Sequence, residues 1–472
     1  MSTIRAMRLG IIAPPFFSHF NALEALAAEL VARGHRVTFI HQADARGWLR
    51  DGAVGFETVG TRSHPPGSLA ATLRRAANPG GPLGLRRVIV EMARTTAMLC
   101  EALPEVATAL HLDGLVCDQM EAAGGLVAEA LGLPFVSVAC ALPVNREPGL
   151  PLPVMPFSYG DDERSLAICR GSTQVYDVLM TPHRRTIAAQ ATRLGLPARD
   201  GLHACLSPYA QLSQTVAAFD FPRRQAPAGF HAVGPLRVSR AMQRALPFPV
   251  AADRPFVFAS LGTLQGHRLP IFRRIARACR ALDAQLLIAH CGGLDAAAAD
   301  RLRADGATWV TDFVDQSAAL ARADAVVSHG GLNTVMDAVA ARTPILVLPI
   351  AFDQAGVAAR VVHAGIGLRL SRRASARALR DRLATLLDTS SAAAAQRRQR
   401  LAALAEALDE AGGVAYAADI VESVLAQHAA RTLAPAVPAT PYDRASPSPG
   451  HGPASDARRA AASAGADPGA VQ

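Results

Sequence analysis

Two stretches of alternating short strands and helices, joined by short links, constrain the fold more than any other feature of the 472-residue chain. The first begins with an apolar run at residues 7–13, followed by apolar residues at helical spacing between 23 and 31 and a second strand-like run at 36–40. Strands joined through a helix by such short links lie parallel in one sheet, so the sequence predicts a Rossmann-like, doubly wound α/β domain. Later strands of this sheet are expected at residues 115–117 and 135–139.

A second alternation of the same kind follows a polar, proline-bearing stretch at residues 237–254, which we interpret as an interdomain linker. Its strands are expected at residues 256–260, 285–289, 309–310, 325–328 and 345–348. We therefore expect two Rossmann-like domains, residues 1–236 and residues 237–428, with a ligand cleft at the carboxyl ends of their strands.

Two segments stand outside this pattern. Residues 146–208 are mixed in character and give no clear assignment. Residues 429–472 are rich in Ala, Pro, Ser, Gly and Arg, and they are predicted to form a disordered tail because they cannot bury enough apolar area to fold.

The chain has no lysine, so arginine supplies all 48 of its Lys and Arg positions, and the formal net charge is +9. Without lysine there can be no Walker-A phosphate loop and no Schiff base, which excludes P-loop NTPases and pyridoxal-phosphate enzymes. No GxGxxG fingerprint supports a hydride-transferring enzyme, and no HExxH or CxxC pattern indicates a metal site. A bound phosphate must therefore be held by backbone N–H groups, hydroxyls, His or Arg.

The location of the protein follows from weaker signals. Seven cysteines without a CxxC pair fit a reducing cytoplasm, and we find neither a secretory signal nor an apolar run of membrane-spanning length. We expect a cytoplasmic protein without a nucleic-acid partner. Arginine pairs at 74–75, 86–87, 184–185 and 223–224 could attract anionic lipid, although scattered solvated arginines are the alternative interpretation.

The best candidate for a phosphate site is the segment 325–334 (AVVSHGGLNT). A strand is expected to end at Ser328, and two glycines, the second being Gly331, turn the chain into a helix opened by Asn333 and Thr334. Such a helix start presents free N–H groups and the positive end of a dipole, and His329 can donate to a phosphate oxygen. An ordinary glycine-rich turn with a buried histidine remains the alternative.

Two further candidates follow other strands. Asp353 and Gln354 offer acceptors and donors that suit sugar hydroxyls, although an exposed Asp-Gln pair is more often a solvated loop. His19 lies in the loop after the first strand, where it could act as a general base near neutral pH. Asp118 ends another strand of that sheet, and its carboxylate could orient the imidazole and stabilise the imidazolium. A structural or solvated histidine is the alternative.

Taken together and in this order, the segments resemble the UDP-glycosyltransferase superfamily of the GT-B fold over about residues 7–422. The resemblance is carried by FVDQ at 313–316, HGGLNT at 329–334, Asp337, Thr343-Pro344 and the DQ pair at 353–354.

The resemblance implies a role for each matching residue. Phe313 and Gln316 would hold the uracil, and Asp337 the ribose hydroxyls; many relatives have Trp in place of Phe313 and commonly Glu in place of Asp337. The remaining donor contacts would fall on Ser260, Thr263, His329, Gly331, Asn333 and Thr334 at the diphosphate and on Asp353 and Gln354 at the sugar. His19 would be the catalytic base and Asp118 its partner. The resemblance also implies that the segment 415–425 packs back across the domains.

Four segments resemble the bacterial zeaxanthin glucosyltransferase subgroup in particular: ASLGTLQGHR, LLIAHCGGL, DFVDQSAAL and PIAFDQAGVAARVVHAGIG. The expected activity is then metal-independent, inverting transfer of glucose from UDP-glucose, as co-substrate, to the ring hydroxyls of zeaxanthin. Apart from that co-substrate, no cofactor is expected. Other apolar acceptors (a macrolide, sterol or phenolic), a GT-B sugar-nucleotide epimerase or hydrolase, and a silent UDP-sugar-binding protein remain alternatives. A carotenoid acceptor would add contact with the inner face of the cytoplasmic membrane.

Overall fold

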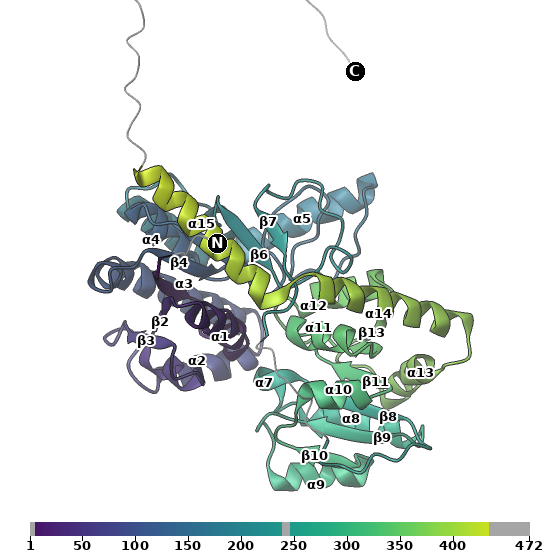
Figure 1. The fold of residues 1–472 in the computed structure, drawn as a ribbon. Coiled ribbons are helices and arrows are strands. Elements are labelled where there is room, and N and C mark those ends of the chain that lie inside the picture. The colour runs from purple at the N-terminus through teal and green to yellow at the C-terminus, as the bar shows by residue number, and fades with distance from the viewer. Residues whose placement is uncertain (1–4, 238–245, 434–472) are drawn as a thin grey trace, which may run out of the picture. The chain divides into compact units, whose positions relative to one another are not determined.

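The computed structural model describes residues 5–237 and 246–433. Two parallel β-sheets, one formed before and one after residue 237, organise these residues, and helices pack around each sheet (Figure 1). The prediction of an α/β chain with two Rossmann-like, doubly wound domains is therefore confirmed. None of the helices in the described ranges is long and apolar enough to cross a membrane.

The first sheet has seven parallel strands in the order β3-β2-β1-β4-β5-β6-β7. Their bounds are β1 (Arg8–Ile12), β2 (Arg36–His41), β3 (Gly55–Thr58), β4 (Gly114–Asp118), β5 (Phe135–Ala139), β6 (Ala210–Ser213) and β7 (Phe230–Ala232). The order reverses between β1 and β4, which makes the carboxyl ends of these two strands a topological switch point.

Helices and 3-10 turns connect these strands. They are α1 (Phe17–Ala32), η1 (Ala43–Trp48), α2 (Ser68–Ala77), α3 (Pro82–Ala109), α4 (Ala122–Leu131), α5 (Glu163–Leu179), α6 (Thr181–Arg193) and η2 (Leu202–Cys205). The segment 146–208, which the sequence leaves unassigned, thus contains α5, α6 and η2.

The second sheet has six parallel strands in the order β10-β9-β8-β11-β12-β13. Their bounds are β8 (Phe256–Ser260), β9 (Gln285–Ala289), β10 (Trp309–Thr311), β11 (Ala325–Ser328), β12 (Ile345–Val347) and β13 (Gly367–Arg369). Its helices are α7 (Gly262–Gln265), α8 (Leu269–Arg280), α9 (Ala296–Asp305), α10 (Gln316–Arg322), α11 (Leu332–Ala340), α12 (Gln354–His363), α13 (Ala376–Leu387) and α14 (Ala392–Glu410). The order reverses between β8 and β11, where Ser260 pairs with Ser328.

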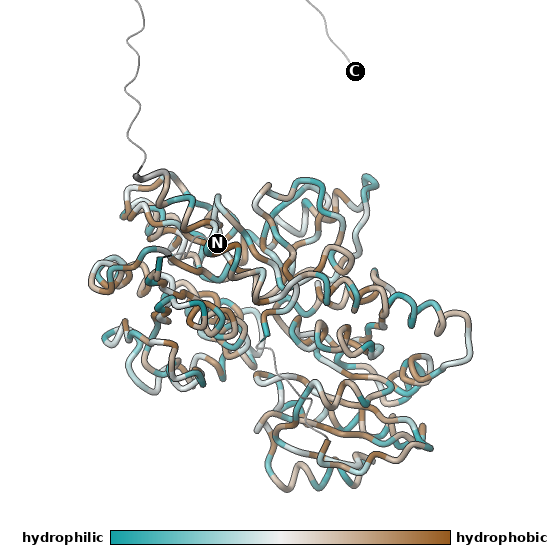
Figure 2. The backbone as a smooth tube through the Cα atoms, viewed as in Figure 1, coloured by the Kyte–Doolittle hydropathy of each residue, from teal (hydrophilic) through white to brown (hydrophobic). Residues whose placement is uncertain are grey.

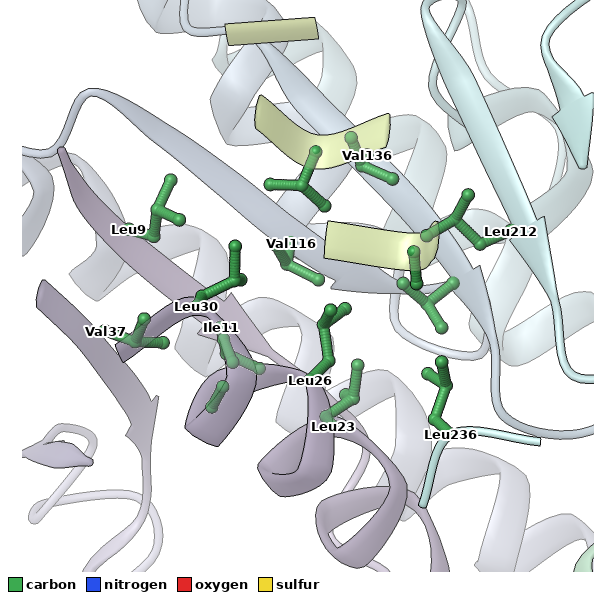
Figure 3. Packing of buried hydrophobic residues seen from close by; sticks show 14 of the residues in the cluster. Leu9, Ile11, Leu23, Leu26, Leu30, Val37, Val116, Val136, Leu212 and Leu236 are labelled. Atoms are coloured by element: carbon green, nitrogen blue, oxygen red, sulfur yellow. The ribbon is translucent and has the colours of Figure 1, made fainter. Parts of the chain in front are cut away.

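Helices connect the strands of both sheets and cover the faces of each sheet. The strands are therefore parallel and consist largely of apolar residues. Hydrophobic residues follow the strands of both sheets in Figure 2. In the first domain, side chains of α1 such as Leu23 and Leu26 point toward Ile11 of β1 and Val116 of β4 (Figure 3). This packing fixes the start of α1 against the carboxyl end of β1.

The last helix, α15 (Gly413–Leu433), returns to the first domain. Its apolar residues, including Val421 and Leu425, belong to the same core cluster as α1 and β1. Arg33 at the end of α1 also pairs with Asp419 and Glu422 of α15, at 2.6 and 3.0 Å. The helix continues past the predicted domain boundary at residue 428, and the rest of the predicted tail, 434–472, lies outside the described residues.

Candidate functional site

The first half of the site lies at the switch point of the first sheet. His19 stands in the first turn of α1, directly after β1, and Asp118 is the last residue of β4, the neighbouring strand. The Nδ1 atom of His19 lies 2.7 Å from Oδ2 of Asp118. The Asp118 side chain is fully buried, and its other oxygen accepts a 2.8 Å hydrogen bond from the backbone N–H of Met120.

This geometry defines the protonation state of the imidazole. A carboxylate only accepts hydrogen bonds, so the proton in the His19–Asp118 contact sits on Nδ1 and Nε2 is the free basic nitrogen. Burial lowers the pKa of His19, but the charge and hydrogen bond of Asp118, together with the charge of Asp353, outweigh it and leave the pKa raised. The pair can therefore accept a proton at Nε2 and stabilise the resulting cation.

Cys140, just after β5, stands beside this pair. Ligand atoms of His19, Asp118 and Cys140 all lie within 4.8 Å of one another, so the three could in principle hold a metal ion. Burial raises the pKa of the Cys140 thiol well above its usual value, so a metal ion bound there would have to displace the thiol proton. Because His19 Nδ1 and Asp118 already share a proton at 2.7 Å, the donor set favours a hydrogen-bonded dyad over a metal centre.

The second half of the site lies at the switch point of the second sheet. β11 ends at Ser328, Gly330 turns the chain with a φ of 90°, and Gly331 is the N-cap of α11. Gly331 provides no capping side chain, so the first N–H groups of α11 are available to an anion. α11 begins at Leu332, one residue before the start at Asn333 that the sequence predicts, so Asn333 and Thr334 lie inside its first turn.

His329 is wedged between two glycines of this half. A Cβ atom on Gly262 or on Gly331 would come within 2.8 Å of its Nε2 atom. Burial lowers the pKa of His329 to about 4, although a hydrogen bond to the backbone of Ser260 works in the opposite direction. The ring is therefore neutral at physiological pH, and its single N–H, which donates to the backbone of Ser260, would have to turn from that partner to donate to a phosphate oxygen.

Ser260 and Thr263 begin the neighbouring turn. Ser260 ends β8, and its hydroxyl accepts a 3.3 Å hydrogen bond from the backbone N–H of Gly262. Thr263 is exposed on the short helix α7, and within the described residues no side-chain hydrogen bond joins it to the other predicted site residues.

The predicted nucleoside-binding residues form a connected polar network. The amide nitrogen of Gln316 donates to Asp337 at 2.6 Å, and its carbonyl oxygen accepts from the Thr334 hydroxyl at 3.4 Å. Arg237 donates to the other oxygen of Asp337 at 3.2 Å and to the backbone carbonyl of Asn333 at 3.3 Å. The sequence does not indicate a role for Arg237, because a single arginine at the start of a polar linker carries no recognisable pattern.

Phe313 lies apart from this network, in the link between β10 and α10. Its ring is 68% exposed, which is unusual for so large an apolar side chain. Such a ring offers a flat, accessible face against which a planar base could stack.

Asp353 and Gln354 sit at the start of α12, where contacts from the first domain reach them. The carboxylate of Asp353 accepts a 3.2 Å hydrogen bond from the backbone N–H of Leu142, and burial raises its pKa. The carbonyl oxygen of Gln354 accepts from the backbone N–H groups of Ile350 and Ala351, which leaves its amide nitrogen as the group available to a ligand.

Further contacts close the two halves on each other. The Asn333 amide donates to the backbone carbonyl of Ser18 at 3.4 Å, next to His19. Phe16 packs edge-on against Phe352, with ring centres 5.7 Å apart. The His19–Asp118 dyad of the first domain thus borders the same site as the start of α11 and the Asp353–Gln354 pair of the second domain.

Two Rossmann-like, doubly wound domains, with a His–Asp dyad at the switch point of one and a helix start without a side-chain cap at that of the other, have the arrangement of a GT-B glycosyltransferase. The family model of the glycosyltransferase family 28 C-terminal domain matches residues 272–411. A solved structure, the glycosyltransferase of kitacinnamycin, superposes with a TM-score of 0.68 at 23% identity, covering 89% of this chain and 99% of that one.

Curated relatives give a narrower placement. The chain is 52% identical to the zeaxanthin glucosyltransferase of Pantoea ananas over 415 residues, 88% of this chain and 95% of that protein. It is 49% identical to the zeaxanthin glucosyltransferase of Pseudescherichia vulneris, covering 88% and 97%. The chain therefore belongs to the glycosyltransferase family that includes the bacterial zeaxanthin glucosyltransferases, and it is a sugar-transferring enzyme.

Proposed function

We propose that this enzyme transfers glucose from UDP-glucose to the ring hydroxyls of zeaxanthin, with inversion at the anomeric carbon and His19 as general base. Zeaxanthin as acceptor rests on the two relatives near 50% identity that bear this activity in their names. The observation that carries the mechanism is the 2.7 Å contact between His19 and the buried Asp118, beside the carboxylate of Asp353.

The donor is assigned to the second domain. The uracil stacks on Phe313, and its polar edge is read by Gln316. Asp337, oriented by Gln316 and Arg237, accepts hydrogen bonds from the ribose hydroxyls. The diphosphate lies against the first N–H groups of α11 and the neutral ring of His329, which stabilise negative charge as the leaving group departs.

The sugar lies between the DQ pair and the dyad. Asp353 and the amide of Gln354 hold its hydroxyls, so the anomeric carbon faces the first domain. The acceptor oxygen attacks this carbon while Nε2 of His19 removes the hydroxyl proton, and the bond to the UDP oxygen breaks on the opposite face. The single displacement converts an α-linked donor into a β-glucoside, and Asp118 stabilises the imidazolium that forms.

A carotenoid diol resides in lipid bilayers, so the proposed acceptor implies contact with the surface of the cytoplasmic membrane. In three of the four arginine pairs that the sequence suggests for this contact, at least one arginine pairs with an acidic residue of the protein. Arg75 pairs with Glu91, Arg184 with Asp200 and Arg224 with Asp161, while Arg223 is nearly buried against Asp220. These three pairs are partly neutralised. In the pair Arg86-Arg87, both residues are exposed and neither has an ion-pair partner in the described residues.

The test is turnover by the purified enzyme with UDP-glucose and detergent-dispersed zeaxanthin, followed by NMR of the glucoside to read the anomeric configuration. A panel of sterols, macrolides and phenolics tests the competing acceptors. UDP release that needs no acceptor would indicate a hydrolase, and absence of release under all conditions an epimerase that retains UDP in its product or a silent binding protein. An α-glucoside product would contradict inversion.

A further inference from the structure

We propose that the exposed apolar face of α5 docks the enzyme on the lipid bilayer, so that the acceptor is taken from the membrane at this helix. The inference deepens the proposed function and rests on it for the identity of the acceptor. Its central observation is a stripe of exposed apolar residues along the solvent face of this helix.

The apolar face of α5 is a continuous stripe. Val175 and Val178 are 59% and 74% exposed, and Ile168 and Leu179 are also exposed. Positions 168, 171, 175 and 178 recur at helical spacing, so they share one side of the helix. The stripe consists of Ala167, Ile168, Gly171, Val175, Val178 and Leu179, all of them exposed. Four large exposed apolar side chains on one helix of 17 residues, about 25 Å long, indicate a binding surface rather than scattered exposure.

Charges around the stripe fit an anionic surface. Arg164 lies within the stripe by helical spacing, and Arg170 borders it. Both are exposed, and neither has an ion-pair partner among the residues that the structure describes.

The nearby acids, by contrast, are mostly engaged within the protein. Asp161 pairs with Arg224, Asp162 caps the start of α5, and Asp177 pairs with Arg146. Asp161, Asp162 and Glu163 are all exposed, and Glu163, in the first turn of α5, is the one of these three without an ion pair or a capping contact in the described residues.

A second copy of the chain fits this surface less well. In a symmetric dimer the same patch meets itself, which would bring the arginines of both copies together in an apolar interface. A bilayer containing anionic lipid satisfies both properties at once, because the apolar side chains enter the boundary of the acyl chains and the arginines stay with the headgroups.

The chain connects α5 to the His19–Asp118 dyad, so a membrane contact at α5 lies on the segment that leads to the proposed catalytic base. The chain leaves β5 at Cys140, beside His19 and Asp118, and runs through residues 140–162 directly into α5. Arg146 of this segment pairs with Asp177, and Cys169 donates to the carbonyl of Gly149 at 3.5 Å. The docking helix is thus fastened to the segment that begins at the proposed catalytic base.

The experiment compares Val175→Glu/Val178→Glu with a matched control, Leu131→Glu/Val362→Glu, which places the same charges at exposed apolar positions of α4 and α12. All four sites are exposed, so we expect unchanged melting temperatures. Sedimentation with phosphatidylglycerol–phosphatidylcholine vesicles should fall at least tenfold for the α5 variant and stay at the wild-type level for the control. Arg164→Gln/Arg170→Gln should reduce binding by about fivefold per charge and weaken its salt dependence.

Activity separates docking from catalysis. The α5 variant should retain turnover of detergent-dispersed zeaxanthin and lose turnover of zeaxanthin embedded in vesicles. Vesicle binding equal to wild type would overturn the docking assignment, as would a wild-type dimer that Val175→Glu/Val178→Glu converts to a monomer. Failure of the wild type to glucosylate zeaxanthin in detergent would refute the proposed acceptor instead, while sedimentation would still decide the role of α5.

Discussion

Arg360 of α12 forms a buried ion pair with Asp220, which follows β6 in the other domain. Its guanidinium also lies 4.3 Å from the centre of the Phe221 ring. Burial alone would raise the pKa of Asp220, but the charges of Arg360 and Arg223 keep it lowered. Because α12 begins with Gln354, this pair ties the helix that carries one of the proposed sugar-binding residues to the first domain.

Removing one partner of the Asp220–Arg360 pair should destabilise the protein strongly. Asp220→Asn leaves Arg360 buried without its counter-charge, and we expect a loss of about 3–5 kcal/mol in the free energy of unfolding. Denaturant unfolding measures this loss. Asp300→Asn, which removes an exposed pair with Arg303, serves as the control and should cost less than about 1 kcal/mol. Equal effects of the two substitutions would show that the Asp220–Arg360 ion pair does not stabilise the protein in this way.

His19→Ala should lower kcat by roughly 10²–10⁴-fold, as expected for the loss of a general base, with little effect on UDP affinity. The reason is that His19 lies in the first domain, whereas the donor contacts assigned here come from the second. Steady-state kinetics and calorimetric titration with UDP measure the two effects. A variant that turns over like the wild type would show that another group accepts the proton.

The pH dependence of kcat/KM should report the dyad. Because the base acts in its neutral form and its pKa is raised, activity should fall as pH drops through a midpoint above 6.5. Asp118→Asn removes the charge that raises this pKa and leaves the burial that lowers it, so the midpoint should move to lower pH while kcat also decreases. A pH profile that is unchanged in Asp118→Asn would contradict the coupling, and a variant that does not fold would show that Asp118 is structural.

The sequence predicts the strand–helix alternation well wherever strands are apolar and fully buried. β5, β8, β9 and β11 have the predicted bounds, because burial on both faces makes each strand a continuous apolar run. The edge strands β3 and β13 and the short strands β6 and β7 were not predicted. Glu57, Gln211, His231 and Arg369 interrupt their apolar character, so pairing in the sheet, rather than composition, defines them.

The candidate site was predictable to a similar degree. Parallel topology brings the residues after β1, β4, β8 and β11 to two switch points, so a strand-end pattern suffices to locate His19 and His329. The contribution of Arg237 depends on a contact with Asp337 of α11 100 positions away in the sequence, and that of Asp220 on a pairing over 140 positions. Neither contact has a local signal.

Substitutions of the proposed donor-binding residues in the second domain should weaken UDP binding without altering the fold. Phe313→Ala removes an exposed stacking surface, and we expect UDP affinity to fall by roughly 10- to 100-fold, corresponding to about 1–3 kcal/mol of base stacking. His329→Ala should lower affinity by about tenfold through the lost hydrogen bond to phosphate. Calorimetry with UDP and with uridine separates the effects, since His329 should matter only when phosphate is present. Unchanged UDP affinity in both variants would refute the donor assignment.

Turnover should persist after treatment with EDTA. In the proposed reaction, the charge of the departing diphosphate is stabilised by the α11 N–H groups and by His329, and the proton of the acceptor goes to His19, so no step requires a cation. The grouping of His19, Asp118 and Cys140 makes the test specific, because a metal held there would depend on the sulfur. Cys140→Ala should therefore keep kcat within about threefold of wild type, since a thiol is a weak hydrogen-bond donor and its contact with the backbone carbonyl of His19 is long, at 4.0 Å. Loss of activity in EDTA that zinc or magnesium restores in the wild type, but not in Cys140→Ala, would instead assign a metal to the dyad and replace general-base catalysis by His19.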